Sequence, residues 1–218
     1  MESPERNTEL HHVAIEGVIG AGKTTLAVKL AKFIDAKPML EKFEENPFLE
    51  KFYEDISHYA FQTQIFFLLS RYRQQQELAQ TDLFEQTIVS DYMFEKDKIF
   101  AYLNLQDDEL KLYETMVGLL EKSVPKPDLV VYLQSSVDRL MTNIKKRGRK
   151  YERSMPKEYI QSLNEAYNYF FFRYKSSPLL IVNTEQIDFA NDEEDFERLA
   201  SEILRPRKVA EYYNPILR

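Results

Sequence analysis

Eight residues near the amino end, 17–24, have the types and spacing of a phosphate-binding loop. Their sequence, GVIGAGKT, fills every fixed position of the pattern G-x-x-x-x-G-K-[ST]. Glycines let the backbone turn tightly enough for its amide groups to point at phosphate oxygens, and a following helix adds partial positive charge. In such a loop Lys23 reaches the β- and γ-phosphates and Thr24 ligates Mg²⁺. The motif predicts a nucleoside triphosphate site with Mg²⁺ and leaves the phosphate acceptor open.

The elements on either side of this loop suit it. A short apolar run, 12–15, predicts a buried strand before the loop, and 25–31 predicts the helix after it. Further along, short apolar, largely β-branched runs alternate with helical patterns, which is typical of a parallel sheet with helical crossovers. We therefore predict an α/β fold with a five-stranded parallel sheet. Its strands are expected at 12–15, 38–40, 87–90, 129–133 and 179–182, and further helices at 57–79 (with Ser57 as N-cap), 107–122, 137–147, 156–174 and 192–204.

Composition narrows the class of protein. The 218 residues suit one domain across 1–218, although the tail 205–218 shows no readable period. The net charge of −7 argues against a general nucleic-acid binder. The absence of cysteine excludes disulfides, thiol catalysis and cysteine-ligated zinc, and it fits a reducing cytoplasm. The acidic amino end is no signal peptide, and no apolar run reaches the ~20 residues of a membrane span. We expect a cytoplasmic protein that binds neither nucleic acid nor membrane.

Three further groups would complete a phosphoryl-transfer site. Glu41 follows the second strand, where a carboxylate can accept a hydroxyl proton, although its charged neighbours favour an ordinary surface glutamate. Asp91 follows the third strand and is either a second Mg²⁺ group or a turn residue capping the next helix. Arg147 and Arg149 flank Gly148 in a basic cluster, which predicts a mobile lid over the phosphates or a solvated basic face.

The predicted helix 57–79 mixes aromatic, amide and arginine side chains. Such a surface holds a nucleobase by stacking and paired hydrogen bonds, whereas most of the phenylalanines are better explained as core. The three histidines have no metal-ligand spacing and receive no role. The residues in question are Phe61, Gln62, Gln64, Phe66, Phe67 and Arg71.

Together these residues resemble the deoxyribonucleoside kinase family, especially its bacterial deoxyadenosine and deoxyguanosine kinases. The similarity runs from Val13 to about Leu204. The segments that carry it are Ile15-Glu16-Gly17 before the loop, Glu41, 45–53 (ENPFLEKFY), Phe61-Gln62-Thr63-Gln64, Leu69-Ser70-Arg71, Ser90-Asp91-Tyr92, and Arg147-Gly148-Arg149 with Glu152.

The resemblance implies a role for each matching position. Glu41 corresponds to the base for the nucleoside 5′-hydroxyl, Gln64 to the base-reading glutamine with Gln62 as the alternative, and Arg71 with Asp97 to a pair on the nucleobase edge. Tyr53 and Glu152 correspond to groups that grip the 3′-hydroxyl, and Arg147 and Arg149 to arginines of a lid at about 147–155. The donor triphosphate is assigned to Gly17, Gly20, Ala21, Gly22, Lys23, Thr24 and Thr25, and its adenine to the loop 183–189 with Asp188 and Phe189.

The implied activity is 5′-phosphorylation of a deoxyribonucleoside by ATP with Mg²⁺ in nucleotide salvage, with purines preferred and deoxyadenosine first. The resemblance also implies a homodimer, for which 107–122 is a candidate surface, and feedback inhibition by a deoxynucleoside triphosphate. Many family members have arginine directly after the acidic residue of the third strand, where this chain has Tyr92. The rivals are a thymidylate or other nucleoside monophosphate kinase, which the acidic surroundings of Glu41 disfavour, and a non-catalytic nucleotide-binding regulator.

Overall fold

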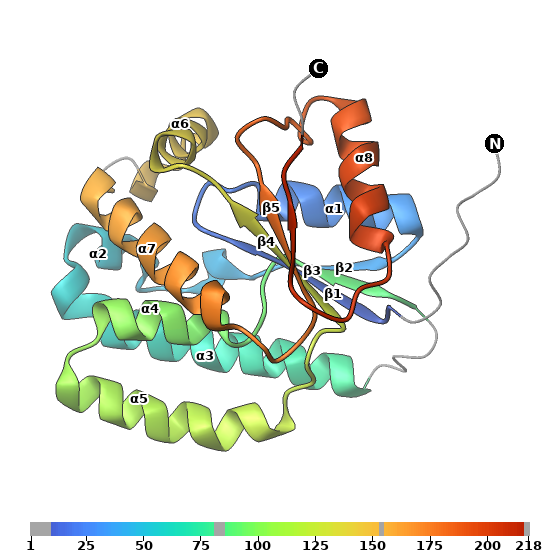
Figure 1. Cartoon of the computed structure of the whole chain (residues 1–218). Coiled ribbons are helices and arrows are strands. Elements are labelled where there is room, and N and C mark those ends of the chain that lie inside the picture. Colours follow the sequence, from blue (N-terminus) through green and yellow to red (C-terminus); the bar gives the residue numbers. More distant parts are fainter. Residues whose placement is uncertain (1–9, 81–85, 153–154, 216–218) are drawn as a thin grey trace.

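A six-stranded parallel sheet in the order β2-β3-β1-β4-β5-β6 forms the centre of the molecule (Figure 1). The computed structural model describes residues 10–80, 86–152 and 155–215. The predicted α/β class is confirmed, and all five predicted strands are present. The strands are β1 (His12–Gly17), β2 (Lys37–Met39), β3 (Ile88–Ser90), β4 (Leu129–Gln134), β5 (Leu179–Asn183) and β6 (Glu211–Tyr213).

Helices cover both faces of the sheet, as a parallel sheet with buried strands requires. In Figure 1, α1 and α8 lie on one face, while α3, α4 and α7 lie on the other with α5 outside them. The helices are α1 (Lys23–Ile34), α2 (Leu49–Glu54), α3 (Ile56–Gln80), α4 (Lys96–Asn104), α5 (Asp107–Leu120), α6 (Val137–Arg147), α7 (Lys157–Arg173) and α8 (Glu193–Leu204).

Aromatic contacts join these layers. All six residues of β1 are buried. On one face, Phe33 of α1 and Phe196 of α8 meet edge to face with ring centroids 5.6 Å apart. On the other, Tyr132 of β4 stacks on Phe171 of α7 at 4.3 Å. Most of the predicted helices therefore bury an apolar face against the sheet, which is where their stability comes from.

Two short helices and one cap differ from the predictions. Helix α3 begins at Ile56, and its cap is Asp55, whose carboxylate accepts a hydrogen bond from the His58 amide at 3.2 Å; Ser57 lies inside the helix. Helices α2 and α4 were not predicted. They have six and nine residues and no side-chain cap, so they lack the period and the start signal on which a prediction rests.

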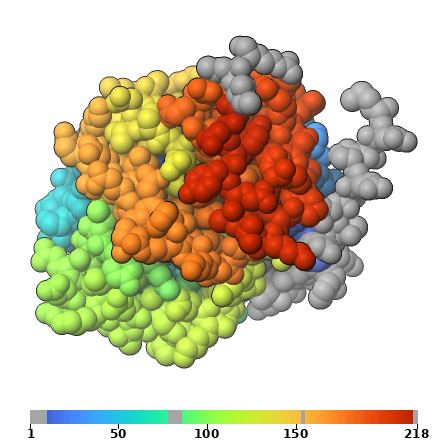
Figure 2. Space-filling model, viewed as in Figure 1, coloured from blue at the N-terminus to red at the C-terminus, as the bar shows by residue number. Residues whose placement is uncertain are grey.

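The tail, which the sequence left unassigned, adds the sixth strand. Strand β6 pairs with β5 in parallel, with Tyr212 opposite Ile181. The Arg207 side chain is almost fully buried and bonds Glu202 of α8 at 3.3 Å, which ties the tail to the body. Figure 2 shows this segment, in dark red, lying flat against α8 and beside α7.

The carboxyl ends of three neighbouring strands, β2, β3 and β1, bring the predicted site together. The phosphate-binding loop follows β1, Glu41 follows β2 and Asp91 follows β3. In open parallel sheets ligands bind at this edge, where the strand order reverses.

Candidate active site

The phosphate-binding loop has the backbone that its glycines allow. Gly22 precedes α1 in the left-handed region, with φ +90°, and a Cβ there would lie 2.9 Å from Cζ of Phe189. Lys23 Nζ donates hydrogen bonds to the carbonyl oxygens of Gly17 at 2.8 Å and Val18 at 3.2 Å. Burial, reinforced by the charge of Lys96, lowers the pKa of Lys23 to about 8. The loop therefore holds its ammonium group in place beside the amides that would meet the phosphates.

A donor pocket opens beside this loop. Arg139 lines this pocket and was not predicted from the sequence. Its guanidinium donates hydrogen bonds to the carbonyl oxygens of Glu185 at 3.0 Å and Ile187 at 2.6 Å. Arg139 thus fixes the loop predicted to hold adenine. The predicted donor residues that line the pocket are Gly20, Ala21, Gly22, Lys23, Thr24, Thr25, Arg147, Arg149, Asp188 and Phe189. Gly17 does not line the donor pocket. A Cβ at position 17 would lie 2.9 Å from the Leu133 carbonyl oxygen, so glycine is needed there for the close pairing of β1 with β4.

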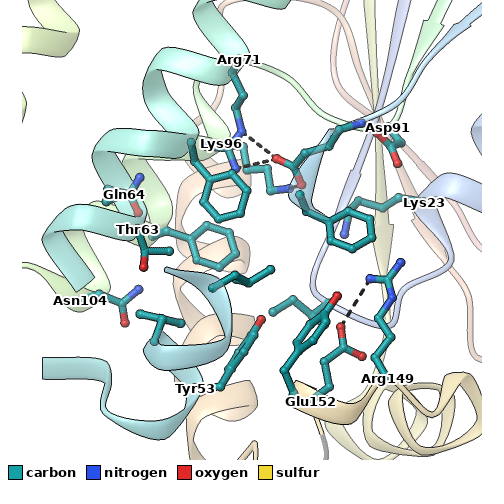
Figure 3. Close-up of a pocket in the computed structure, with 18 of the residues that line it drawn as sticks. Lys23, Tyr53, Thr63, Gln64, Arg71, Asp91, Lys96, Asn104, Arg149 and Glu152 are labelled. Carbon is teal, nitrogen blue, oxygen red and sulfur yellow. Dashed lines mark hydrogen bonds and ion pairs between the residues drawn. The ribbon is translucent and has the colours of Figure 1, made fainter. Parts of the chain in front are cut away.

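A second pocket lies on the other side of Lys23 and is shown in Figure 3. Its volume is about 840 Å³ when the solvent at its open mouth is included. Gln64 lines it, whereas Gln62 is exposed on the outside of α3. The other predicted acceptor residues in its wall are Glu41, Tyr53, Arg71, Asp91 and Glu152, and sequence reasoning missed Phe43, Thr63, Lys96, Asn104 and Tyr151.

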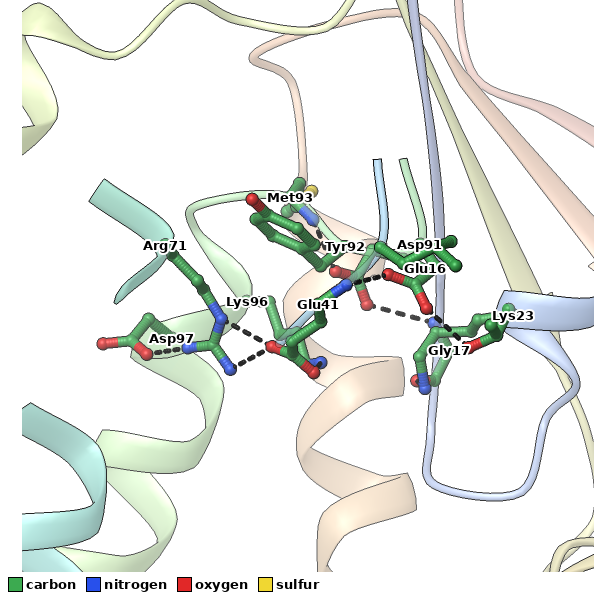
Figure 4. A network of polar contacts seen from close by, with 12 residues as sticks. Glu16, Gly17, Lys23, Glu41, Arg71, Asp91, Tyr92, Met93, Lys96 and Asp97 are labelled. Atoms are coloured by element: carbon green, nitrogen blue, oxygen red, sulfur yellow. Dashed lines mark hydrogen bonds and ion pairs between the residues drawn. The ribbon is translucent and has the colours of Figure 1, made fainter. Parts of the chain in front are cut away.

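Glu41 is the centre of the polar network in this pocket (Figure 4). Its Oε1 accepts a hydrogen bond from Arg71 Nε at 2.7 Å and forms an ion pair with Arg71 Nη2 at 2.6 Å. Its Oε2 accepts a hydrogen bond from Lys96 Nζ at 2.8 Å. Burial by itself would raise the pKa of Glu41, but the charges and hydrogen bonds of Arg71 and Lys96 outweigh it and hold the pKa far below its usual range. Glu44 and Glu45, by contrast, are exposed. The surroundings of Glu41 are therefore cationic, and the acidity argument against a monophosphate acceptor does not hold.

Arg71 and Asp97 are brought together as predicted, but only Arg71 lines the pocket. The Arg71 guanidinium donates to Asp97 Oδ1 and lies 4.9 Å from the ring centroid of Phe67. Asp97 is fully buried, and its Oδ2 has no hydrogen-bond partner within the described residues. Gln64 Nε2 donates to the backbone oxygen of Asp97 at 2.8 Å. This places an arginine and an amide in the pocket wall, with a carboxylate oxygen that has no partner among the described residues buried behind them.

The two predicted Mg²⁺ ligands lie side by side. Thr24 Oγ1 donates to Asp91 Oδ2 at 2.5 Å, and Asp91 Oδ1 accepts from the Glu41 amide at 2.7 Å. Among residues 10–80, 86–152 and 155–215, no three His, Cys, Asp or Glu side chains cluster as a metal site. Mg²⁺ keeps several waters and takes one or two protein oxygens besides substrate phosphates, so this hydroxyl and carboxylate fit it.

The two arginines predicted to form a lid share one buried carboxylate. Glu152 accepts hydrogen bonds from Arg147 at 2.5 and 3.1 Å and pairs with Arg149 at 3.5 Å. Arg149 also stacks over Phe43, 3.9 Å from the ring centroid. Gly148, with φ +71°, ends α6 between the two arginines. The predicted lid, 147–155, includes residues 153 and 154, which lie outside the described residues.

Tyr53 stands beside Glu152 in the acceptor pocket. Its ring stacks on that of Tyr151 with centroids 5.7 Å apart. Burial raises the pKa of the Tyr53 hydroxyl, and nearby Tyr159 and Glu152 raise it further. The hydroxyl therefore stays protonated at neutral pH and is able to donate a hydrogen bond to a ligand.

Tyr92 plays no part in the pocket. Its side chain is fully buried, and its hydroxyl donates to Gln74 Oε1 at 3.1 Å behind the end of β2. The cation that enters the pocket from this part of the chain is Lys96, four residues later. No motif marks Lys96; only the turn from β3 into α4 brings it back to Glu41.

The donor and acceptor pockets meet at four residues that line both. These are Lys23, Thr24, Arg147 and Arg149. A phosphate-binding loop joined in this way to a second pocket that can hold an organic ligand defines the site of a P-loop phosphotransferase. Within the described residues, no helix has the length and apolarity needed to cross a membrane.

Comparisons with known proteins specify the class further. A family model, deoxynucleoside kinase, matches residues 13–206, so the chain belongs to the deoxynucleoside kinase family. It is 35% identical over 196 residues to a deoxyguanosine kinase of Bacillus subtilis, covering 88% of this chain and 95% of that protein. It is 30% identical over 199 residues to a deoxyadenosine/deoxycytidine kinase of the same organism, covering 88% and 90%. A structure of a deoxyadenosine kinase from M. mycoides with bound dATP matches with a TM-score of 0.76 at 26% identity, covering 88% of this chain and 97% of that one. The resemblance inferred from the motifs is confirmed.

Proposed function

We propose that this protein transfers the γ-phosphoryl group of ATP to the 5′-hydroxyl of a deoxyribonucleoside, with purines preferred and deoxyadenosine first, in nucleotide salvage. The observation that carries this proposal is the meeting of the two pockets at Lys23, Thr24, Arg147 and Arg149, with Glu41 just inside the acceptor pocket. In this arrangement a triphosphate in one pocket points at a hydroxyl in the other. The names of the relatives, which include kinases for guanine, adenine and cytosine deoxynucleosides, support the substrate class.

In the proposed reaction the 5′-oxygen attacks the γ-phosphorus while the bond to the β-phosphate oxygen breaks, and Glu41 accepts the hydroxyl proton. Lys23 and the lid arginines stabilise the charge on the transferring group. Thr24 and Asp91 are the residues that would hold Mg²⁺, which neutralises phosphate charge when bound. At the other end of the nucleoside, Tyr53 and Glu152 would bind the 3′-hydroxyl, and Gln64 and Arg71, the latter held by Asp97, would read the base.

The function is tested by a phosphorylation assay with ATP and Mg²⁺ over the four deoxynucleosides, their ribose counterparts and their 5′-monophosphates. Transfer to a deoxynucleoside is the expected result. Transfer only to a monophosphate would assign a nucleoside monophosphate kinase, and ATP binding without any transfer would assign a regulator.

Glu41→Gln tests the proposed base directly. The amide cannot accept the proton, so kcat is expected to fall by roughly 10²–10⁴. Deoxynucleoside binding, measured by calorimetry, should remain, because Arg71 and Gln64 are unchanged. Turnover close to that of the wild type in a folded variant would exclude Glu41 as the base.

We further propose that the protein is a cytoplasmic homodimer. Helix α5, the candidate surface, exposes Leu112 by 52% and Leu119 by 70%. Light scattering of the purified protein measures the mass, and replacing both leucines by glutamate should yield monomers if α5 forms the interface. A dimer that survives this double substitution would exclude α5.

A further inference from the structure

Lys96 is a buried cation whose position carries an electrostatic cost. Its side chain is only 6% exposed, and it is the first residue of α4, where the helix dipole disfavours positive charge. Its charge also acts on Lys23, so a second ammonium group faces the same space. The hydrogen-bonded partner that compensates this cost is Glu41, whose Oε2 lies 2.8 Å from Lys96 Nζ. The charge of buried Glu16 and the ring of Phe100, whose centroid lies 5.8 Å from Nζ, also favour the cation.

Glu41 does not need Lys96 in order to be neutralised. Arg71 alone already gives Glu41 Oε1 two contacts at 2.6 and 2.7 Å. Lys96 is therefore a second positive partner for a carboxylate that Arg71 already neutralises, and it contacts Oε2, the oxygen that Arg71 leaves free. Lys96 also lines the acceptor pocket, whose wall includes Lys23 and Thr24, and its charge acts on Lys23. A second cation on this oxygen, in the wall of the pocket, fits an anion that arrives during the reaction.

We propose that Lys96 is a catalytic residue that exchanges partners during phosphoryl transfer, from Glu41 in the free enzyme to the 5′-phosphate as it forms. This inference rests on the proposed function. The bond between the 5′-oxygen and phosphorus forms, the bond to the β-phosphate oxygen breaks, and its electron pair leaves with ADP. The hydroxyl proton goes to Glu41, which becomes neutral and later releases the proton to water. Lys96 then has no counter-charge at Glu41, and the nearest new anion is the product phosphate.

This exchange predicts an unequal effect on substrate and product. The deoxynucleoside carries no charge and meets Lys96 only through Glu41, whereas the deoxynucleoside 5′-monophosphate would pair with Lys96 directly. Lys96→Met should bind the deoxynucleoside as the wild type does and bind the monophosphate about tenfold more weakly or worse. The kcat should fall by roughly 10²-fold with little change in the KM for the deoxynucleoside. Lys96→Arg, which keeps the charge, should recover most of both losses.

Lys98→Met is the matched control. Lys98 lies on the same helix two residues away, and its ammonium pairs with Glu121 outside the pocket. It should leave both affinities and kcat unchanged, while any general damage to α4 would affect both variants. Circular dichroism and thermal melts report whether each variant is folded.

The results separate the two proposals. If the wild type phosphorylates no deoxynucleoside, the proposed function fails. If the wild type is active and folded Lys96→Met keeps its kcat, or loses deoxynucleoside and monophosphate affinity equally, the role of Lys96 is excluded. If Lys96→Met does not fold, Lys96→Arg decides: monophosphate affinity and kcat close to those of the wild type support a charge role. Loss of both in a folded Lys96→Arg variant contradicts it.

Discussion

At Glu41, two positive partners make the carboxylate a weak base and a well-positioned acceptor. Arg71 and Lys96 hold its pKa below its usual range, so it is ionised at neutral pH and has little tendency to take a proton from an unreacted hydroxyl. A loose transition state suits such a base, because the proton becomes acidic only as the new bond to phosphorus forms. Sequence spacing placed Glu41 at a strand end but gave no sign of Lys96, since the contact depends on the path of α4.

His12 provides a pH test at the residue scale. Burial lowers the pKa of its imidazole to about 4 from an ordinary 6.5, although Asp128 opposes this, and Nε2 lies 2.8 Å from Ser90 Oγ. The unfolded chain therefore binds a proton at His12 below pH 6.5 that the folded chain does not. The free energy of unfolding should fall by roughly 1 kcal/mol from this residue alone between pH 7.5 and 5.5.

Urea denaturation at the two pH values measures this loss, and His12→Gln should show less of it. An equal loss in the variant would mean that other groups cause it.

At the scale of elements, the phosphate-binding loop and α1 form one unit whose geometry the sequence determines closely. The motif requires glycine at position 22, where the backbone is left-handed, and α1 begins at the next residue, Lys23. Helix α6 matches its predicted bounds of 137–147 because Ser136 caps it and Gly148 ends it. Helices α2 and α4 lack such signals and are positioned by packing against α3.

Two substitutions compare a glycine that the phosphate-binding loop requires with one on α5 that can be replaced. Gly118→Ala on α5 meets nothing within 4 Å of its new Cβ, so it should stabilise the protein by roughly 0.5–1 kcal/mol. Gly22→Ala has the left-handed φ and the contact with Phe189, so it should cost about 1–3 kcal/mol and weaken ATP binding. Thermal melts and ATP titration measure both. A stable Gly22→Ala variant with normal ATP affinity would contradict this account of the loop.

At the scale of the whole molecule, the sheet follows from the alternation of strand and helix patterns, except at its last strand. Strand β6 has three residues after an irregular segment, and its partner β5 is about 30 residues earlier. Pairing over that distance depends on the completed body rather than on local sequence. The side chains of Tyr212 and Tyr213 point to opposite faces, since Tyr212 is 63% exposed while Tyr213 packs against the core.

Tyr213→Ala should therefore destabilise the protein by about 1–2 kcal/mol, less than the ~3–5 kcal/mol of a fully buried aromatic residue. Tyr212→Ala, its neighbour on the same strand, should change stability by less than about 0.5 kcal/mol. Chemical denaturation of both variants compares them. Equal effects would show that β6 does not dock as described.

Glu152 has a consequence for how the two substrates influence each other. The carboxylate that would bind the sugar of the acceptor also holds Arg147 and Arg149, which line the donor pocket. A nucleoside bound at Glu152 would release these arginines toward the triphosphate, and a triphosphate that attracts them would free Glu152 for the sugar. Thermodynamic linkage then requires each substrate to tighten the binding of the other by the same factor. The enzyme would remain weakly engaged with either substrate alone and close fully only on the pair, which limits the loss of phosphoryl groups to water.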